Sequence, residues 1–125
     1  MKIVSTTAAP AAIGPYSQAV VVNDLVFTSG QIPIVPATGA VAQGGIADQA
    51  RQSAENVKAV LEEAGADCST VIKTTCFLAD MKDFAVFNVF NSKFIHIQWF
   101  PKHNTFIMGW LVKKYRIFFN RFKSS

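Results

Sequence analysis

The first third of the chain alternates short apolar runs with turn residues. Residues 18–22 and 25–32 are rich in β-branched and apolar side chains, and only Asn23 and Asp24 separate them. A two-residue connection of this kind between two such runs predicts a β-hairpin. Residues 33–45 hold two prolines and three glycines, which predicts a loop after the hairpin.

The pattern then changes to intervals of three and four, which predicts an amphipathic helix. Its apolar and small positions are Ile46, Ala50, Ser53, Val57, Leu61 and Ala64. Asp48 favours the first turn of this helix, and Gly65 is placed to end it. The charged residues that follow belong to its solvent face, so catalysis by the neighbouring pair Glu62 and Glu63 is not expected.

The remaining pattern predicts a strand, a second helix and two further strands. Residues 71–78 form a β-branched and apolar run, and residues 104–112 and 115–122 are two more. Between them, Asp80 or Asp83 is placed to cap a helix that carries Phe84, Phe87, Phe90 or Asn91, and Phe94. Pro101 is expected to end the secondary-structure element that precedes it. The order predicts an α+β fold in which two helices pack on one face of a mixed sheet.

Length and composition favour one domain over residues 1–125. No apolar run approaches the roughly 18 residues that span a bilayer, and the N-terminus lacks the apolar stretch of a signal peptide, so we expect a cytoplasmic protein without membrane contact. Cys68 and Cys76 make no disulfide framework, which suggests a reducing compartment and simple packing roles. His96 and His103 have no cysteine or carboxylate close in sequence, so no metal site is expected.

Charge and aromatic content change abruptly near residue 88. Residues 1–88 hold five bases against eight acids, a net charge of −3, whereas residues 89–125 hold seven bases and no acid. The second segment also carries ten of the fifteen aromatic residues. Such a break marks a change in what the chain contacts, and 37 residues are too few for a second domain.

Two short segments carry the most chemistry. Residues 14–19 are GPYSQA and residues 27–33 are FTSGQIP; we call them the signature segments. Gly30 follows an apolar run, where a glycine often marks close approach of a ligand or another backbone. The Ser29 hydroxyl and the Gly30 N–H at a strand end are suited to a small polar molecule. On spacing alone, a turn followed by a bulge is the favoured explanation of these residues.

The signature segments resemble the reactive-intermediate imine/enamine deaminases, the RidA or YjgF family, which also carries the older label endoribonuclease L-PSP. The likeness continues through QARQSAENVK at 49–58, EEAG at 62–65, VIKTT at 71–75, FLADM at 77–81 and DFAVFN at 83–88. It therefore covers residues 1–88 almost without a gap, whereas residues 89–125 diverge.

The resemblance implies a subunit with the chorismate-mutase-like α+β fold, assembled as a homotrimer with ligand sites between subunits. It implies hydrolysis of 2-imino acids (2-iminobutanoate and 2-iminopropanoate) to 2-oxo acids and ammonia without a cofactor. It places Tyr16, Ser29 and Gly30 in the substrate site, with Asn88 nearby. An arginine would bind the substrate carboxylate in a bidentate manner, and a glutamate would hold and deprotonate the attacking water.

The second half departs from the family at both of these charged positions. Counted on from Pro101, His103 stands where the family has its carboxylate-binding arginine, and Asn120 stands where it has its water-holding glutamate. An asparagine orients a water but cannot accept its proton. The resemblance thus makes His103 a substitute substrate-binding residue and Asn120 a substitute catalytic residue.

Two explanations of residues 89–125 stay open. Either the tail has diverged and left a weakened or altered site, or it is non-native, for example after a reading-frame shift beyond Asn88. Three functions follow: a deaminase, whose activity the loss of the site arginine and glutamate can weaken; a non-catalytic trimer that binds small carboxylates or a protein; and an RNA-binding or endoribonuclease-type activity through the basic aromatic tail. Solvated lysines on apolar strands account for that tail without nucleic acid.

Overall fold

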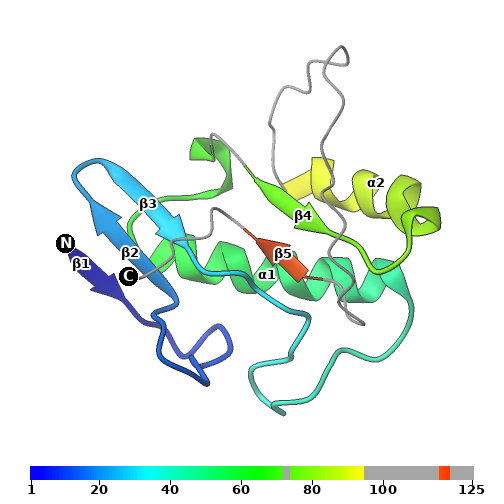
Figure 1. Ribbon diagram of the computed structural model, residues 1–125, viewed down its shortest axis with the longest axis horizontal. Coiled ribbons are helices and arrows are strands. Elements are labelled where there is room, and N and C mark those ends of the chain that lie inside the picture. The colour runs from blue at the N-terminus through cyan, green and yellow to red at the C-terminus, as the bar shows by residue number, and fades with distance from the viewer. Residues whose placement is uncertain (72–73, 95–115, 119–125) are drawn as a thin grey trace.

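The computed structural model describes residues 1–71, 74–94 and 116–118, and the structural statements below concern these residues. Figure 1 shows the hairpin of the N-terminal sheet at one end of the molecule and α2 at the other, with the long helix α1 between them. In chain order, the elements are β1 (Lys2–Val4), β2 (Ala19–Val22), β3 (Leu25–Thr28), α1 (Ile46–Glu63), η1 (Cys68–Thr70), β4 (Thr75–Phe77), η2 (Met81–Asp83), α2 (Phe84–Phe94) and β5 (Arg116–Phe118).

Three antiparallel strands form the N-terminal sheet in the order β1-β2-β3. The predicted hairpin is confirmed: Asn23 and Asp24 connect β2 to β3, and Asn23 has a φ of 51°, the left-handed conformation that a two-residue turn demands. The second strand is shorter than the expected 25–32, because the ladder ends at Thr28. The strand β1, which pairs with β2 from Val4 opposite Ala19, was not predicted.

Helix α1 follows the predicted periodicity closely. Its buried residues include Ala50, Ser53, Val57 and Leu61, all members of the predicted stripe. At its start the Asp48 carboxylate accepts a hydrogen bond from the Gly45 N–H at 3.3 Å, and a side chain at Gly44 would collide with that carboxylate. At its end Gly65 adopts a φ of 82°, so the predicted stop is confirmed.

The second sheet joins segments that lie far apart in the sequence. β4 falls within the predicted strand 71–78, and β5 falls within the predicted strand 115–122. They pair antiparallel, with Cys76 opposite Ile117. The expected strand 104–112 lies outside the described residues. Every strand pair in the described ranges is antiparallel, so the mixed sheet stays a prediction.

The second helix begins through a short 3-10 turn. The Asp80 carboxylate accepts a hydrogen bond from the Lys82 N–H at 2.9 Å and so caps η2, which leads directly into α2. Of the two predicted capping residues, Asp80 is therefore the one that caps this turn. Phe87 is 5% exposed and Phe84 is half-buried, as expected for the inner face of this helix.

Two apolar clusters share α1. One cluster consists of small residues and valines: Val4, Ala9, Ala19 and Val60. The other contains residues from α1, α2 and the position directly after β4: Ala50, Val57, Leu61, Leu78 and Phe87. Helices and strands thus pack together through α1, which confirms the α+β class.

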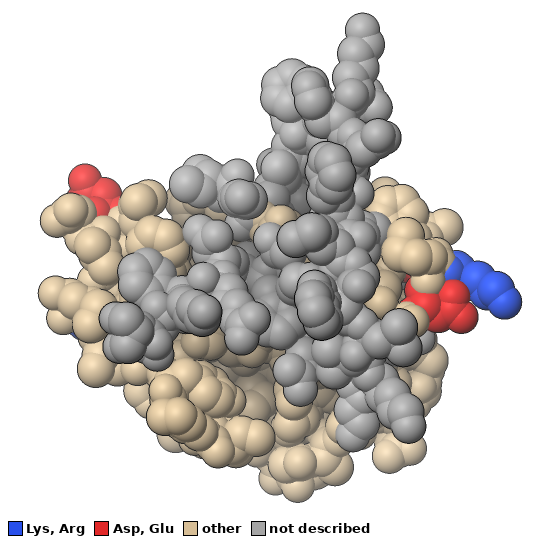
Figure 2. Space-filling view, in the orientation of Figure 1, with Lys and Arg blue, Asp and Glu red and all other residues tan. Residues whose placement is uncertain are grey.

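Among the residues that Figure 2 colours by charge, few acidic or basic side chains are visible on this face. Among the coloured residues, the acidic and basic side chains in this view lie at two opposite edges of the face. Within the part of the chain that the structure describes, no helix is long and apolar enough to cross a membrane.

Candidate functional site

The two signature segments lie against each other. The Ser29 Oγ donates a hydrogen bond to the Ser17 carbonyl at 2.5 Å, and the Ser29 N–H donates to the Gln18 carbonyl at 2.9 Å. These bonds continue the β2–β3 pairing by one residue beyond Thr28. The segments therefore form one unit at the end of the hairpin, with the Ser29 hydroxyl oxygen still able to accept a hydrogen bond.

Tyr16 is presented on the surface by a tight turn. Its N–H donates to the Gly14 carbonyl at 2.8 Å, and its hydroxyl accepts from the Ile13 N–H at 3.4 Å. The side chain is 47% exposed. The turn therefore offers an aromatic ring and a hydroxyl beside Ser17, within reach of a molecule that approaches from solvent.

A pocket of about 530 Å³ opens beside Tyr16. One side is made by β1 and residues 5–12, and the other by Tyr16, Ser17 and Gln18. Its lining residues are Ile3, Val4, Ser5, Thr6, Thr7, Ala9, Ala11, Ala12, Tyr16, Ser17, Gln18 and Pro36. None of these carries a charge, so this recess offers hydroxyls and apolar surface but no ion-pair partner for a carboxylate.

Gln18 is a residue that the sequence reasoning did not single out individually. It is 3% exposed, and its side-chain amide bonds to the backbone of Thr6, Ala9 and Pro10. The only sequence signal was its place in GPYSQA, directly before a strand. A buried amide at the start of a strand must find partners, and here it finds them in the loop that lines the pocket.

The loop after Gly30 is fixed by an asparagine of α1. Asn56 is fully buried, and its Nδ2 donates to the carbonyls of Ile32 at 3.0 Å and Ile34 at 2.9 Å. Its Oδ1 accepts from the Gln52 side chain at 2.9 Å. The Gln31 side chain in turn donates to the Ser29 carbonyl at 3.3 Å. The backbone around Ser29 and Gly30 is thus held from both sides.

The structure joins some of the predicted site residues and leaves others apart. Tyr16 lines the pocket, whereas Ser29 bonds to the backbone of Ser17, the next residue in the chain, and is not among the lining residues. Gly30 follows Ser29 in a half-buried position and does not line the pocket either. Asn88 is half-buried on α2, and no contact described for it reaches the signature segments. His103 and Asn120 lie outside the described residues, so their predicted roles stay predictions.

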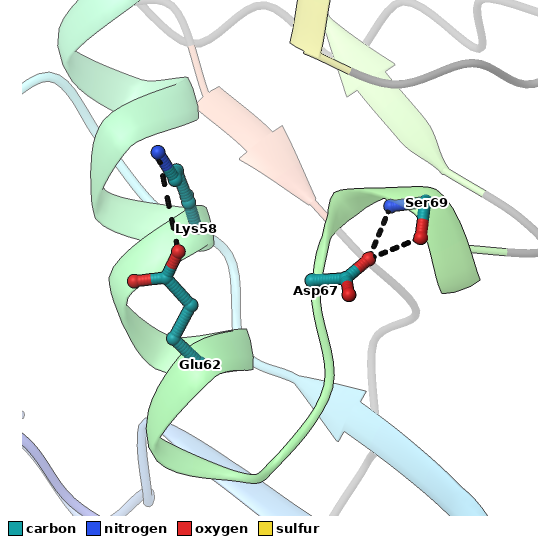
Figure 3. Close-up of polar contacts among 4 residues, drawn as sticks. All are labelled: Lys58, Glu62, Asp67 and Ser69. Carbon is teal, nitrogen blue, oxygen red and sulfur yellow. Dashed lines mark hydrogen bonds and ion pairs between the residues drawn. The ribbon is translucent and has the colours of Figure 1, made fainter.

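The charged groups near the end of α1 have structural roles (Figure 3). Lys58 Nζ lies 3.9 Å from Glu62 Oε1 on the exposed face, and Asp67 accepts hydrogen bonds from the Ser69 N–H and hydroxyl. The bonds from Ser69 hold the pKa of the Asp67 carboxyl below its usual value. Glu62 and Glu63 are both exposed, in agreement with the solvent face expected for them.

The two cysteines are free thiols. Burial raises the pKa of the Cys76 thiol to about 11, and burial also raises the pKa of Cys68. Both pack against the larger apolar cluster, as expected from the sequence. Within the described ranges, no group of three or more histidine, cysteine, aspartate or glutamate side chains is placed to hold a metal ion.

The fold and the recess define a small α+β domain whose paired strand ends present a serine, a tyrosine and a ligand-sized pocket. The chain belongs to the RidA/YjgF family: residues 6–117 match the family model described as Endoribonuclease L-PSP. It is 50% identical over 103 residues to the 2-iminobutanoate/2-iminopropanoate deaminase of Salmonella typhimurium. The matched segment covers 82% of this chain and 76% of that protein.

Solved structures of the same family share the fold. E. coli TdcF, solved with bound serine, is 41% identical and has a TM-score of 0.75 over 94% of both chains. The E. coli YjgF gene product is also 41% identical, with a TM-score of 0.73 over 97% of this chain and 100% of that one. These likenesses agree with the family resemblance found in residues 1–88.

Proposed function

We propose that this protein hydrolyses 2-imino acids to 2-oxo acids and ammonia, at a rate reduced by His103 and Asn120. The observation that carries the proposal is the Ser29–Ser17 contact, which brings Tyr16 and the Ser29 hydroxyl to one strand end. The deaminase name of a relative that is 50% identical supports the same reaction.

The chemistry explains why the rate is reduced. A 2-imino acid carries a carboxylate, for which an arginine is the best partner, and an electrophilic carbon that must receive a deprotonated water. We propose that His103 binds the carboxylate through one nitrogen and that Asn120 orients the water without taking its proton. Loss of a charged anchor for a bound carboxylate costs about 2–5 kcal/mol.

We further propose that the active form is a cytoplasmic homotrimer of single-domain subunits, with substrate bound between subunits. Exposed apolar side chains around the pocket support an interface there: Ile3 is 63% exposed, and Ile13, next to the Tyr16 turn, is 86% exposed. Light scattering after size exclusion should give three times the mass of one 13.6 kDa chain. A monomer at micromolar concentration would contradict this assembly.

A coupled assay tests the reaction. A serine or threonine dehydratase generates the imine, and its lifetime is followed with and without the purified protein. We expect weak acceleration by the wild type, and at least a tenfold gain for the double variant His103→Arg and Asn120→Glu. Lys102→Arg is the matched control, since it adds a guanidinium one position away and should bring no gain. No acceleration by either the wild type or the double variant would overturn the proposal.

A second candidate is carboxylate binding without turnover. The substitution of both charged site residues favours it, and the TdcF structure with bound serine shows that a relative binds a small carboxylate. Titration with 2-oxobutanoate separates the two candidates. Saturable binding together with no imine hydrolysis would support the binding protein, whereas hydrolysis supports the enzyme.

A further inference from the structure

We propose that Gln18 is a positioning residue that sets the shape of the pocket beside Tyr16; its effect on substrate rests on the function proposed above. The side chain is 3% exposed and lies at the point where β1 and β2 separate. Their last backbone pair is Val4 opposite Ala19, and beyond it the two chains diverge around the pocket.

The Gln18 amide replaces the backbone ladder at this point. Its oxygen accepts from the Thr6 N–H at 2.6 Å, and its nitrogen donates to the Thr6 carbonyl at 3.0 Å. Both polar groups of one peptide residue are therefore paired with one side chain, as they would be with a partner strand. This pairing keeps Thr6 beside the sheet although it lies outside β1.

The same amide also binds the backbone of the next residues of the loop. Its nitrogen donates to the Pro10 carbonyl at 2.8 Å, with a longer contact of 3.4 Å to the Ala9 carbonyl. Three carbonyl oxygens thus converge on one NH₂ group, which has two hydrogens to offer. Residues 5–12 consequently fold around Gln18, with Ala9 also packed in the smaller apolar cluster.

Gln18 connects the two sides of the pocket. Its side chain holds Thr6 and Ala9, which line one side of the pocket, and Gln18 itself lines the other side together with Tyr16 and Ser17. Its backbone carbonyl also accepts the Ser29 N–H at 2.9 Å, which ties this side to the end of β3. Tyr16 and Ser17 directly precede it in the chain. The distance across the pocket therefore depends on the length and the hydrogen-bonding pattern of this one side chain.

Other side chains do not reproduce the arrangement. Glutamate at this position keeps an acceptor for the Thr6 N–H but, when ionised, has no donor for the three carbonyls. Methionine has a similar length but lacks both the amide oxygen that accepts from Thr6 and the NH₂ group that donates to the carbonyls. Each change leaves partly buried backbone groups without partners, and the loop must move away from β2 to reach water.

Amide hydrogen exchange tests the geometry in the wild type, whatever the protein's activity. The Thr6 N–H should exchange about tenfold more slowly than the Thr7 N–H, which no described hydrogen bond involves. In Gln18→Met the Thr6 exchange should rise to the Thr7 rate, while the β2–β3 amides stay protected. Equal rates for Thr6 and Thr7 in the wild type would overturn the proposal without use of any variant.

Ligand affinity tests the consequence for the pocket. We expect Gln18→Met and Gln18→Glu each to raise the KM for the imine, and the dissociation constant of 2-oxobutanoate, about tenfold, with kcat changed less than twofold. Gln43→Met is the matched control, because Gln43 is exposed in the loop before α1. A fall in kcat with KM unchanged, or unchanged KM and affinity, would contradict the positioning role.

The two proposals fail in distinguishable ways. If the wild type hydrolyses no imine, the deaminase proposal fails, and Thr6 exchange together with 2-oxobutanoate affinity still decides the role of Gln18. If Gln18→Met does not fold, Gln18→Glu and the wild-type exchange rates decide whether Gln18 has the proposed positioning role.

Discussion

The pocket side of the molecule and the α2 side rely on apolar packing to different degrees. On the pocket side, Val4 and Ala9 pack in the smaller apolar cluster, and in addition the buried amides of Gln18 and Asn56 bond to backbone carbonyls of neighbouring loops. On the α2 side, apolar side chains such as Leu78 and Phe87 pack against α1. Directional hydrogen bonds thus add to apolar packing on the pocket side, whereas the volume of larger side chains sets the packing of the α2 side.

The difference suits the binding of small polar molecules that we propose for this protein. Hydrogen bonds are directional, so an amide that is fully paired fixes a loop in one conformation. Apolar contacts are not directional, and they stabilise the domain without specifying one shape for a surface loop. We therefore expect changes on the α2 side to lower stability, and changes on the pocket side to alter loop structure as well.

The largest effect on stability is expected on the α2 side. Phe87→Ala should lower the free energy of unfolding by about 3–5 kcal/mol, because it leaves a cavity where a 5% exposed ring packs on α1. Val86→Ala is the matched control on the same helix, and its 42% exposed side chain should account for less than about 1 kcal/mol. Urea unfolding measures both. Equal losses for the two variants would show that α2 does not bury Phe87.

The next largest effect is expected from the amide of α1. Asn56→Leu should lower the free energy of unfolding by about 2–4 kcal/mol, because the Ile32 and Ile34 carbonyls lose their donor. Gln52→Ala, which removes only the bond to Asn56 Oδ1, should account for about 1 kcal/mol or less. If Asn56→Leu matched Gln52→Ala, apolar packing rather than hydrogen bonding would dominate this side too.

The smallest of these effects is a dependence of stability on alkaline pH. Burial raises the pKa of Cys76 from 9.0 to about 11 in the folded protein, so the unfolded chain ionises first as pH rises. The stabilisation from the neutral thiol is complete below pH 9 and is lost as pH approaches 11. Between pH 8 and 10.5 the loss is on the order of 2 kcal/mol. Cys76→Ala should show a shallower decline, and an unchanged slope would place the thiol in contact with water.

Local patterns in the sequence were sufficient for much of the fold. The turn at Asn23 and Asp24 determines the hairpin from two residues, and the spacing of Ala50, Val57 and Leu61 determines the buried face of α1. β1 was not predicted because its pairing partner lies some 17 residues away and its middle residue, Ile3, is exposed. Nothing in a three-residue run of that kind distinguishes a strand from a terminal coil.

The candidate site was predictable in part. The signature segments suggested Tyr16, Ser29 and Gly30, whose roles stay predictions, and the structure shows that Ser29 and Ser17 join the two segments. The roles of Gln18 and Asn56 were not predicted, because an amide that bonds to a distant backbone leaves no periodic trace in the sequence. Only the positions of the carbonyls in space show what such an amide holds.

The short span of the Gln18 bonds has a consequence for the order of folding. Its partners lie 8 to 12 residues away, and Ser29 reaches Ser17 across 12 residues. Closing loops of this size requires little chain entropy, so these contacts form without long-range search. During synthesis, the Gln18 and Ser29 side chains therefore have their hydrogen-bond partners as soon as residue 29 has emerged, before the β5 segment that pairs with β4 has been made.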